Sequence, residues 1–96
     1  MTLAELKAST SSSNPPPDLS QTLTALWHDA RGDWTAAHAV AQEISDADGA
    51  WIHAYLHRRE GDLGNAAYWY RRAGRPVETG ALDAEWTTIA ETLLQR

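Results

Sequence analysis

His53 and His57 stand four residues apart, the spacing that places two side chains on one face of a helix. Imidazole nitrogens are common metal ligands, so two histidines at this spacing can share a metal ion. The apolar side chains of the same segment, Trp51 and Tyr55 among them, centre on a different side of the helix. A metal site also needs a third ligand, which the sequence does not identify. We therefore treat His53 and His57 as weak metal candidates and expect solvated histidines, or histidines hydrogen-bonded between helices.

Other reactive groups are scarce. The chain has no cysteine, which excludes a thiol nucleophile, a disulfide framework and a thiolate zinc site. Ser20 and Ser45, the serines outside the first residues of the chain, have no nucleophile motif around them. The segment 46–49, Asp-Ala-Asp-Gly, lacks the later carboxylates of a calcium loop. We predict no catalytic residue and no cofactor, and keep a metal-dependent or histidine-using small enzyme as the alternative function.

Charge is unevenly distributed along the chain. The 96 residues carry a net charge of −5, yet residues 58–75 contain five arginines against two acidic residues. Arg58 and Arg59 end one predicted helix, and Arg71 and Arg72 end the next, antiparallel one. The two pairs should therefore lie at opposite ends of the helices, where they stabilise the helix dipoles. Together with the negative net charge, this argues against nucleic acid as a partner.

Membrane association and secretion have no support in the sequence. No apolar run reaches the length of about 18 residues that a membrane span needs. The first eight residues lack an apolar core behind a basic start, so we expect no secretory signal. We expect a cytoplasmic protein.

Apolar residues recur at helical spacing in five segments, over about residues 19–31, 34–44, 49–60, 63–73 and 81–95. Each segment holds one tryptophan, and we expect at least three of the five in the core. Short connections at Gly32 and Gly61 favour antiparallel neighbours. The predicted fold is all-α, with two antiparallel αα-hairpins and a C-terminal capping helix in a single domain over residues 18–96.

Residues 1–17 differ from this domain in composition. Thr2 and Glu5 have the spacing of a capping box, which could start a short helix through Lys7. The polar run after it ends in three prolines, which fix the backbone and remove three hydrogen-bond donors. We expect residues 1–17 to be a flexible arm.

Two stretches 29 residues apart share one pattern, which begins at His28 and at His57. In each, three variable residues separate the histidine from the sequence Gly-Asp-[Trp/Leu]-x-x-Ala. This pattern resembles the second-helix signature of tetratricopeptide repeats, and residues 61–73 fit it best. A proline also closes the unit in those repeats, as Pro76 does here. The period differs from the usual one of about 34 residues, so the resemblance is to a TPR-like pair of hairpins over residues 20–76. It implies a role in binding proteins or peptides.

Residues 48–76 are also similar to the hallmark stretch of a family of small uncharacterised microbial proteins. That stretch reads DGAWIHAYLHRREGDLGNAAYWYRRAGRP in this chain. The family has no assigned activity, so the similarity implies a fold and no function.

These features favour a small helical module that binds a protein or peptide and performs no chemistry. Trp51, Tyr55 and Arg58 form one stripe on the third predicted helix, and Tyr68 and Arg72 share a face of the fourth. These five residues are the expected binding contacts. Two repeats leave an apolar end uncovered, so we expect the arm or a second copy of the chain, in a homodimer, to cover it.

Overall fold

Six α-helices and no strand build the chain in this computed structural model, which describes residues 1–96. The all-α prediction is confirmed. Five helices lie close to the predicted segments, and a sixth precedes them. They are α1 (Leu3–Ser9), α2 (Gln21–Ala30), α3 (Trp34–Gln42), α4 (Ala47–Arg59), α5 (Leu63–Ala73) and α6 (Leu82–Leu94).

The same turn joins α2 to α3 and α4 to α5. Gly32 and Gly61 have φ values of 80° and 88°, a left-handed conformation that glycine adopts without strain. The following residues, Asp33 and Asp62, each accept the N–H of the third residue after them, at 3.1 and 3.2 Å. Each aspartate N–H also donates to the carbonyl of the histidine five residues earlier, at 3.0 and 2.9 Å. The sequence repeat is therefore also a repeat of backbone geometry.

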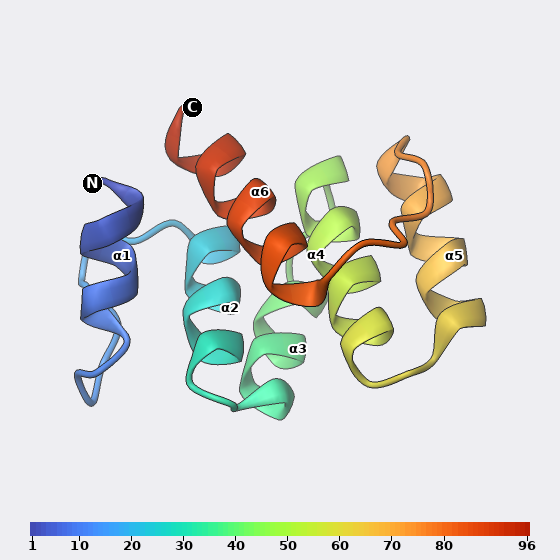
Figure 1. The fold of residues 1–96 in the computed structure, drawn as a ribbon. Coiled ribbons are helices and arrows are strands. Elements are labelled where there is room, and N and C mark those ends of the chain that lie inside the picture. Colours follow the sequence, from blue (N-terminus) through green and yellow to red (C-terminus); the bar gives the residue numbers. More distant parts are fainter.

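Helix α4 is at the centre of the molecule (Figure 1). Helices α2 and α3 lie side by side and run in opposite directions, as do α4 and α5. Helix α3 packs against α4 and so brings the two pairs together. Helix α6 crosses α2 and α4, and thus covers the first helix of each pair instead of stacking beyond α5. None of the six helices has the length and apolar content required to span a bilayer.

The core lies between α4 and the helices around it. Three tryptophans are buried there, Trp27, Trp51 and Trp86, as predicted. The Trp86 indole N–H donates to the Leu26 carbonyl at 3.0 Å, which satisfies a buried donor and ties α6 to α2. The core side chains with no exposed surface include Leu6, Leu26, Ile52, Tyr55, Leu56 and Ile89.

The first residues fold, which differs from the expected flexible arm. Thr2 and Glu5 make the capping box, and α1 packs against α2 and α6. Leu6 is fully buried in this contact. The arginine before the first turn, Arg31, donates to the carbonyl of Thr10 at 2.8 Å and fastens the polar segment to α2. The flexible arm is expected from the Ser- and Pro-rich composition of residues 1–17. Composition does not show the tertiary contacts that order this segment, which are the burial of Leu6 and the hydrogen bond from Arg31.

Candidate metal centre

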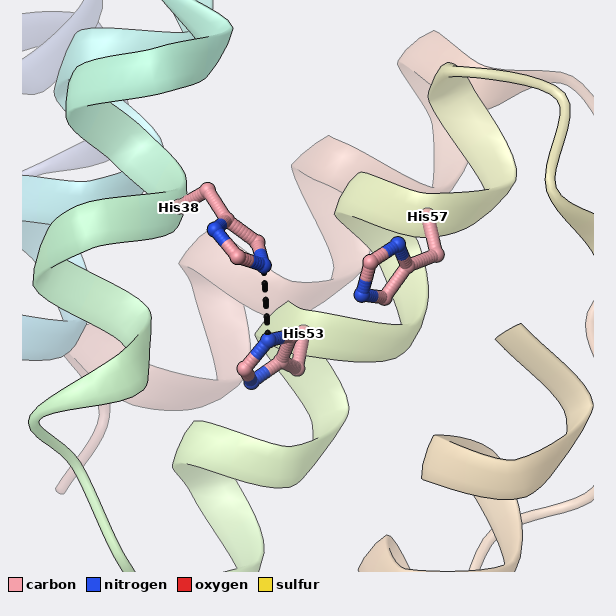
Figure 2. A group of neighbouring side chains, drawn as sticks. All are labelled: His38, His53 and His57. Atoms are coloured by element: carbon pink, nitrogen blue, oxygen red, sulfur yellow. Dashed lines mark hydrogen bonds between the residues drawn. The ribbon is translucent and has the colours of Figure 1, made fainter. Parts of the chain in front are cut away.

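Three histidines converge where α3 packs on α4 (Figure 2). His53 and His57 lie one turn apart on α4, and His38 reaches them from α3. The Nε2 atoms of His38 and His53 are 3.0 Å apart, a hydrogen-bonding distance. One ring nitrogen of each histidine lies within 4.8 Å of the other two. His38 is the third candidate ligand that the sequence did not identify.

The two α4 histidines lie in the interior. Their exposed fractions are 6% for His53 and 7% for His57, because α3 and α5 pack on the side of α4 that carries them. Of the two expected states, solvated or hydrogen-bonded between helices, the structure shows the second at His53. The polar side of α4 is therefore buried between helices and does not face solvent.

Two tryptophans hold two of the rings by stacking. Trp34 lies parallel to His38, with ring centroids 4.7 Å apart and an interplanar angle of 11°. Trp69 lies parallel to His53 at 3.9 Å and 5°. The Trp34 indole N–H donates to the Leu56 carbonyl of α4 at 2.7 Å, which fixes Trp34 across the α3–α4 contact. Both stacks restrict ring rotation and leave the ring edges free to bind.

Hydrogen bonds orient the other nitrogens. Nδ1–H of His57 donates to Oε2 of Glu60 at 2.6 Å, which leaves Nε2 as the ring nitrogen on the side of His53. Nδ1 of His38 accepts from the Gln42 amide at 3.1 Å, and its Nε2–H then donates to His53. If the Gln42 amide presents its oxygen instead, the His38 proton moves to Nδ1 and donates to that oxygen. Nε2 of His38 then has a free lone pair that can bind a metal.

The surroundings favour uncharged imidazole. Burial, with His38 and His57 nearby, lowers the pKa of His53 to about 4. Burial and then His57 also lower the pKa of His38, and Glu60 acts in the opposite direction. Both rings are therefore neutral at neutral pH. Neutral imidazole is the form that donates a lone pair to a metal.

The spacing of the nitrogens is close to that of a metal site. In a tetrahedral zinc site with Zn–N distances of about 2.0–2.1 Å, two ligand nitrogens are about 3.3 Å apart. The His38–His53 pair, at 3.0 Å, is near that value, whereas the other separations reach up to 4.8 Å. The His53 and His57 rings are nearly parallel, at an interplanar angle of 14°, so one of them must rotate for both to bind the same ion. A metal ion bound here would take the place of the proton that His38 and His53 share.

A cavity of about 660 Å³ opens beside the three rings. Its walls come from the end of α3, the start of α4 and one face of α5. The polar side chains on these walls, besides the histidines, are Gln42, Ser45, Asp46, Asn65, Tyr68 and Arg72. The cavity has room for a small molecule next to the ligand nitrogens.

Two of the predicted binding residues, Tyr68 and Arg72, line this cavity with the weak metal candidates His53 and His57. Tyr68 is 43% exposed, and its hydroxyl accepts from Arg72 Nη1 at 3.1 Å. The structure therefore places the predicted α5 face and the α4 histidines in one site.

The other three predicted contacts, Trp51, Tyr55 and Arg58, lie elsewhere. Tyr55 has no exposed surface and donates to a buried α2 carboxylate at 2.7 Å. Trp51 is 4% exposed, beneath the Arg75 guanidinium, whose Cζ is 3.4 Å from the centroid of its ring. Arg58 donates to Glu85 of α6 at 2.8 Å. These side chains contact other parts of the same chain, because α2, α5 and α6 pack around this part of α4.

His38 is the site residue that the sequence reading missed. It stands four residues after Trp34 in a predicted helix, so the two share a face, and that face packs on α4. A search for a third histidine on the helix preceding the His53–His57 pair would have found it. Its direction toward the pair depends on how α3 is rotated against α4.

No family model, no curated protein and no solved structure matches this chain. What the site can do therefore follows from its own geometry.

Proposed function

We propose that this protein binds a divalent transition-metal ion, zinc foremost, through His38, His53 and His57. The observation that carries the proposal is the convergence of three imidazole nitrogens from two helices, all within 4.8 Å of one another. Each ring also has a partner that fixes it, as ligands of bound metals do. Imidazole ligands suit zinc, nickel, cobalt and copper.

The number of protein ligands, three, is that of a metal ion that acts on a bound small molecule. A metal ion with a purely structural role usually has four. Structural zinc sites have four protein ligands, whereas catalytic sites have three and keep one position open. Here three histidines border a cavity of about 660 Å³. A metal ion held this way could polarise a bound group as a Lewis acid. The metal-dependent alternative of the sequence analysis thus becomes the favoured function.

Titration with zinc and nickel tests the proposal directly. Isothermal calorimetry and metal analysis of the wild type should show one ion per chain. Zinc in about 100-fold excess over its Kd should stabilise the fold by about 2.7 kcal/mol, measured as a rise in Tm. His53→Ala should weaken binding by at least about 100-fold, because it removes a direct ligand.

His28→Ala is the matched control, since His28 is the repeat counterpart of His57 and lies on α2 outside the cluster. It should bind zinc like the wild type. Equal zinc affinity in His53→Ala and wild type, with both variants folded by circular dichroism, contradicts the proposal. So does a wild type that binds no metal.

A second candidate function, docking of a protein or peptide, is supported by the open end of the molecule at α5. Leu63 occupies the repeat position of Trp34, but no further hairpin covers it, and it is 67% exposed. Val77 is 54% exposed, and both line a groove of about 320 Å³. Stacked hairpin repeats cover such a face with the next unit. We propose a second copy of this chain as the partner to test first.

Sedimentation velocity over a range of concentrations tests the docking surface. We expect the wild type to self-associate and Leu63→Ser to shift it toward the monomer, because the change removes an apolar contact. Ala39→Ser, at an exposed position of α3, should leave the distribution unchanged. A wild type that stays monomeric throughout, or a Leu63→Ser variant that associates as strongly, would contradict self-association at this end.

A further inference from the structure

We infer that the cavity beside the histidine cluster binds a small oxyanion, a carboxylate or a phosphate group, between the metal ion and Arg72. This inference rests on the proposed metal function. It adds the chemical class of the ligand and a residue that recognises it.

Arg72 is held in place by aromatic side chains. Its Cζ lies 5.2 Å from the Trp69 ring centroid and 5.9 Å from that of Tyr68. Its Nη1 donates to the Tyr68 hydroxyl at 3.1 Å. Cation–π contacts of this kind position a guanidinium without neutralising its charge. The remaining N–H donors of Arg72 can therefore bind an anion.

Arg58, Arg59 and Arg96 have acidic partners, whereas Arg72, like Arg31, Arg71 and Arg75, pairs with no carboxylate. Arg58 pairs with Glu85, and Arg59 lies 3.1 Å from an oxygen of Asp29. The acidic side chain that lines the cavity, Asp46, accepts the Gly49 N–H at 2.9 Å at the start of α4. There the N-terminal end of the helix stabilises its charge. Arg72 thus brings a positive charge to the cavity that this chain leaves unpaired.

Arg72 and the metal ligands lie close to the same indole ring. The His53 ring stacks on Trp69 at 3.9 Å, and the Arg72 guanidinium lies 5.2 Å from the centroid of that same ring. Trp69 therefore contacts both His53 and Arg72 at one wall of the cavity. The amide of Asn65 lies on the cavity wall as well and adds a neutral hydrogen-bonding group.

A ligand in this cavity would face positive charge at both ends. A divalent ion on three neutral imidazoles keeps its full charge, and Arg72 adds a second centre. Two positive centres disfavour a cationic ligand and attract an oxyanion, whose oxygens can coordinate the metal and accept charge-assisted hydrogen bonds from arginine. The forked guanidinium suits carboxylate and phosphate alike.

The test uses the cobalt(II)-loaded protein, whose visible spectrum reports changes in coordination at the metal. Wild type, Arg72→Gln and Arg71→Gln are loaded first, and cobalt uptake is measured. Each is then titrated with sodium acetate and, separately, with sodium phosphate, at an ionic strength held constant with sodium perchlorate. Arg71 is the matched control, because it is adjacent and exposed but does not line the cavity.

We expect all three proteins to take up cobalt equally and the wild-type spectrum to change saturably with anion. Arg72→Gln should bind the anion about 10-fold to 100-fold more weakly, the usual value of a charge-assisted hydrogen bond, and Arg71→Gln should match the wild type. The stronger of the acetate and phosphate responses identifies the oxyanion.

Failure of the two proposals is distinguishable. A wild type that takes up no cobalt overturns the metal site and this inference with it. Normal cobalt uptake with the same anion affinity in wild type and Arg72→Gln overturns the inference alone. Normal uptake with no spectral response to either anion also overturns it.

Discussion

At the scale of single residues, His53 shows how the fold favours neutral imidazole. His38 of α3 and His57 of the same helix lie beside it, and Trp69 of α5 covers one ring face. Burial, and then the neighbouring His38 and His57, lower the pKa of His53 to about 4, from 6.5 for an unperturbed histidine. Between about pH 6.5 and pH 4, His53 is therefore protonated in the unfolded chain but neutral in the folded protein.

The metal-free protein should lose stability as the pH falls from about 6.5 to about 4. In this range the unfolded state binds more protons at His53 than the folded state, so the free energy of unfolding decreases with acid. The contribution is present above about pH 6.5 and amounts to about 3–4 kcal/mol at most, at about 1.4 kcal/mol for each pKa unit between 6.5 and about 4. Urea denaturation with a chelator present, at a series of pH values, measures it.

His53→Gln is the comparison for this prediction, because glutamine can hydrogen-bond but does not titrate. Asp29 acts in the opposite direction: burial raises its pKa, so its contribution is present at low pH and is lost as the pH rises through its folded pKa. Both proteins share Asp29, so their difference isolates His53. The same acid dependence in His53→Gln and wild type would show that His53 does not titrate as described.

At the scale of helices, α4 explains why side chains predicted to contact a partner contact the chain itself. Every residue from Gly49 to His57 is buried, and α4 packs against α2, α3, α5 and α6. A helix covered on all sides needs internal partners for its polar groups. Tyr55 has Asp29 of α2, and His53 has His38 of α3. The polar residues of α4 therefore serve as inter-helix contacts as well as candidate ligands.

The start of α4 depends on a close approach at Gly49. A Cβ added there would meet the Ile44 carbonyl oxygen and would lie 2.6 Å from Ile44 Cγ2. Gly49→Ala should therefore destabilise the protein by about 1–3 kcal/mol, through a forced shift of the preceding turn. It should also weaken zinc binding, since Asp46 and Ala50, which flank this glycine, line the cavity. Chemical denaturation and zinc calorimetry measure the two effects.

Gly64 is the matched control on α5. A Cβ added at Gly64 meets nothing within 4 Å. Gly64→Ala should therefore stabilise the protein by about 0.5–1 kcal/mol through helix propensity alone. If both substitutions change stability in the same direction, the contact with Ile44 does not determine the effect at position 49.

At the scale of the molecule, the candidate metal centre is a product of how the two helix pairs pack. Its ligands come from the second helix of one pair and the first helix of the next, and its cavity wall from α5. Helices α6 and α1 cover the other side, where Leu6 and Trp86 are buried. The end at Leu63 stays open. One face of the packed pairs is thus covered by the chain, one holds the candidate metal centre, and the end at Leu63 is exposed.

The local structure of this chain follows from short-range sequence signals. Asp33 and Asp62 begin helices because an aspartate oxygen accepts the free N–H groups there, and Gly32 and Gly61 adopt the left-handed backbone that ends the preceding helices. The periodicity of apolar residues indicated five of the six helices and the burial of three tryptophans. The caps, the glycine turns and the helical periodicity depend on neighbours within a few residues, so the sequence contains them directly.

The groups that the histidines face are set by the packing of α3, α4 and α5. His38 and His53 are 15 residues apart and meet because α3 has a particular rotation against α4, which periodicity does not specify. The same packing buries the polar side of α4, brings Trp69 and Arg72 beside His53, and docks Leu6 on α2 and α6. A helical pattern shows which residues share a face. What that face contacts depends on side-chain packing between distant segments.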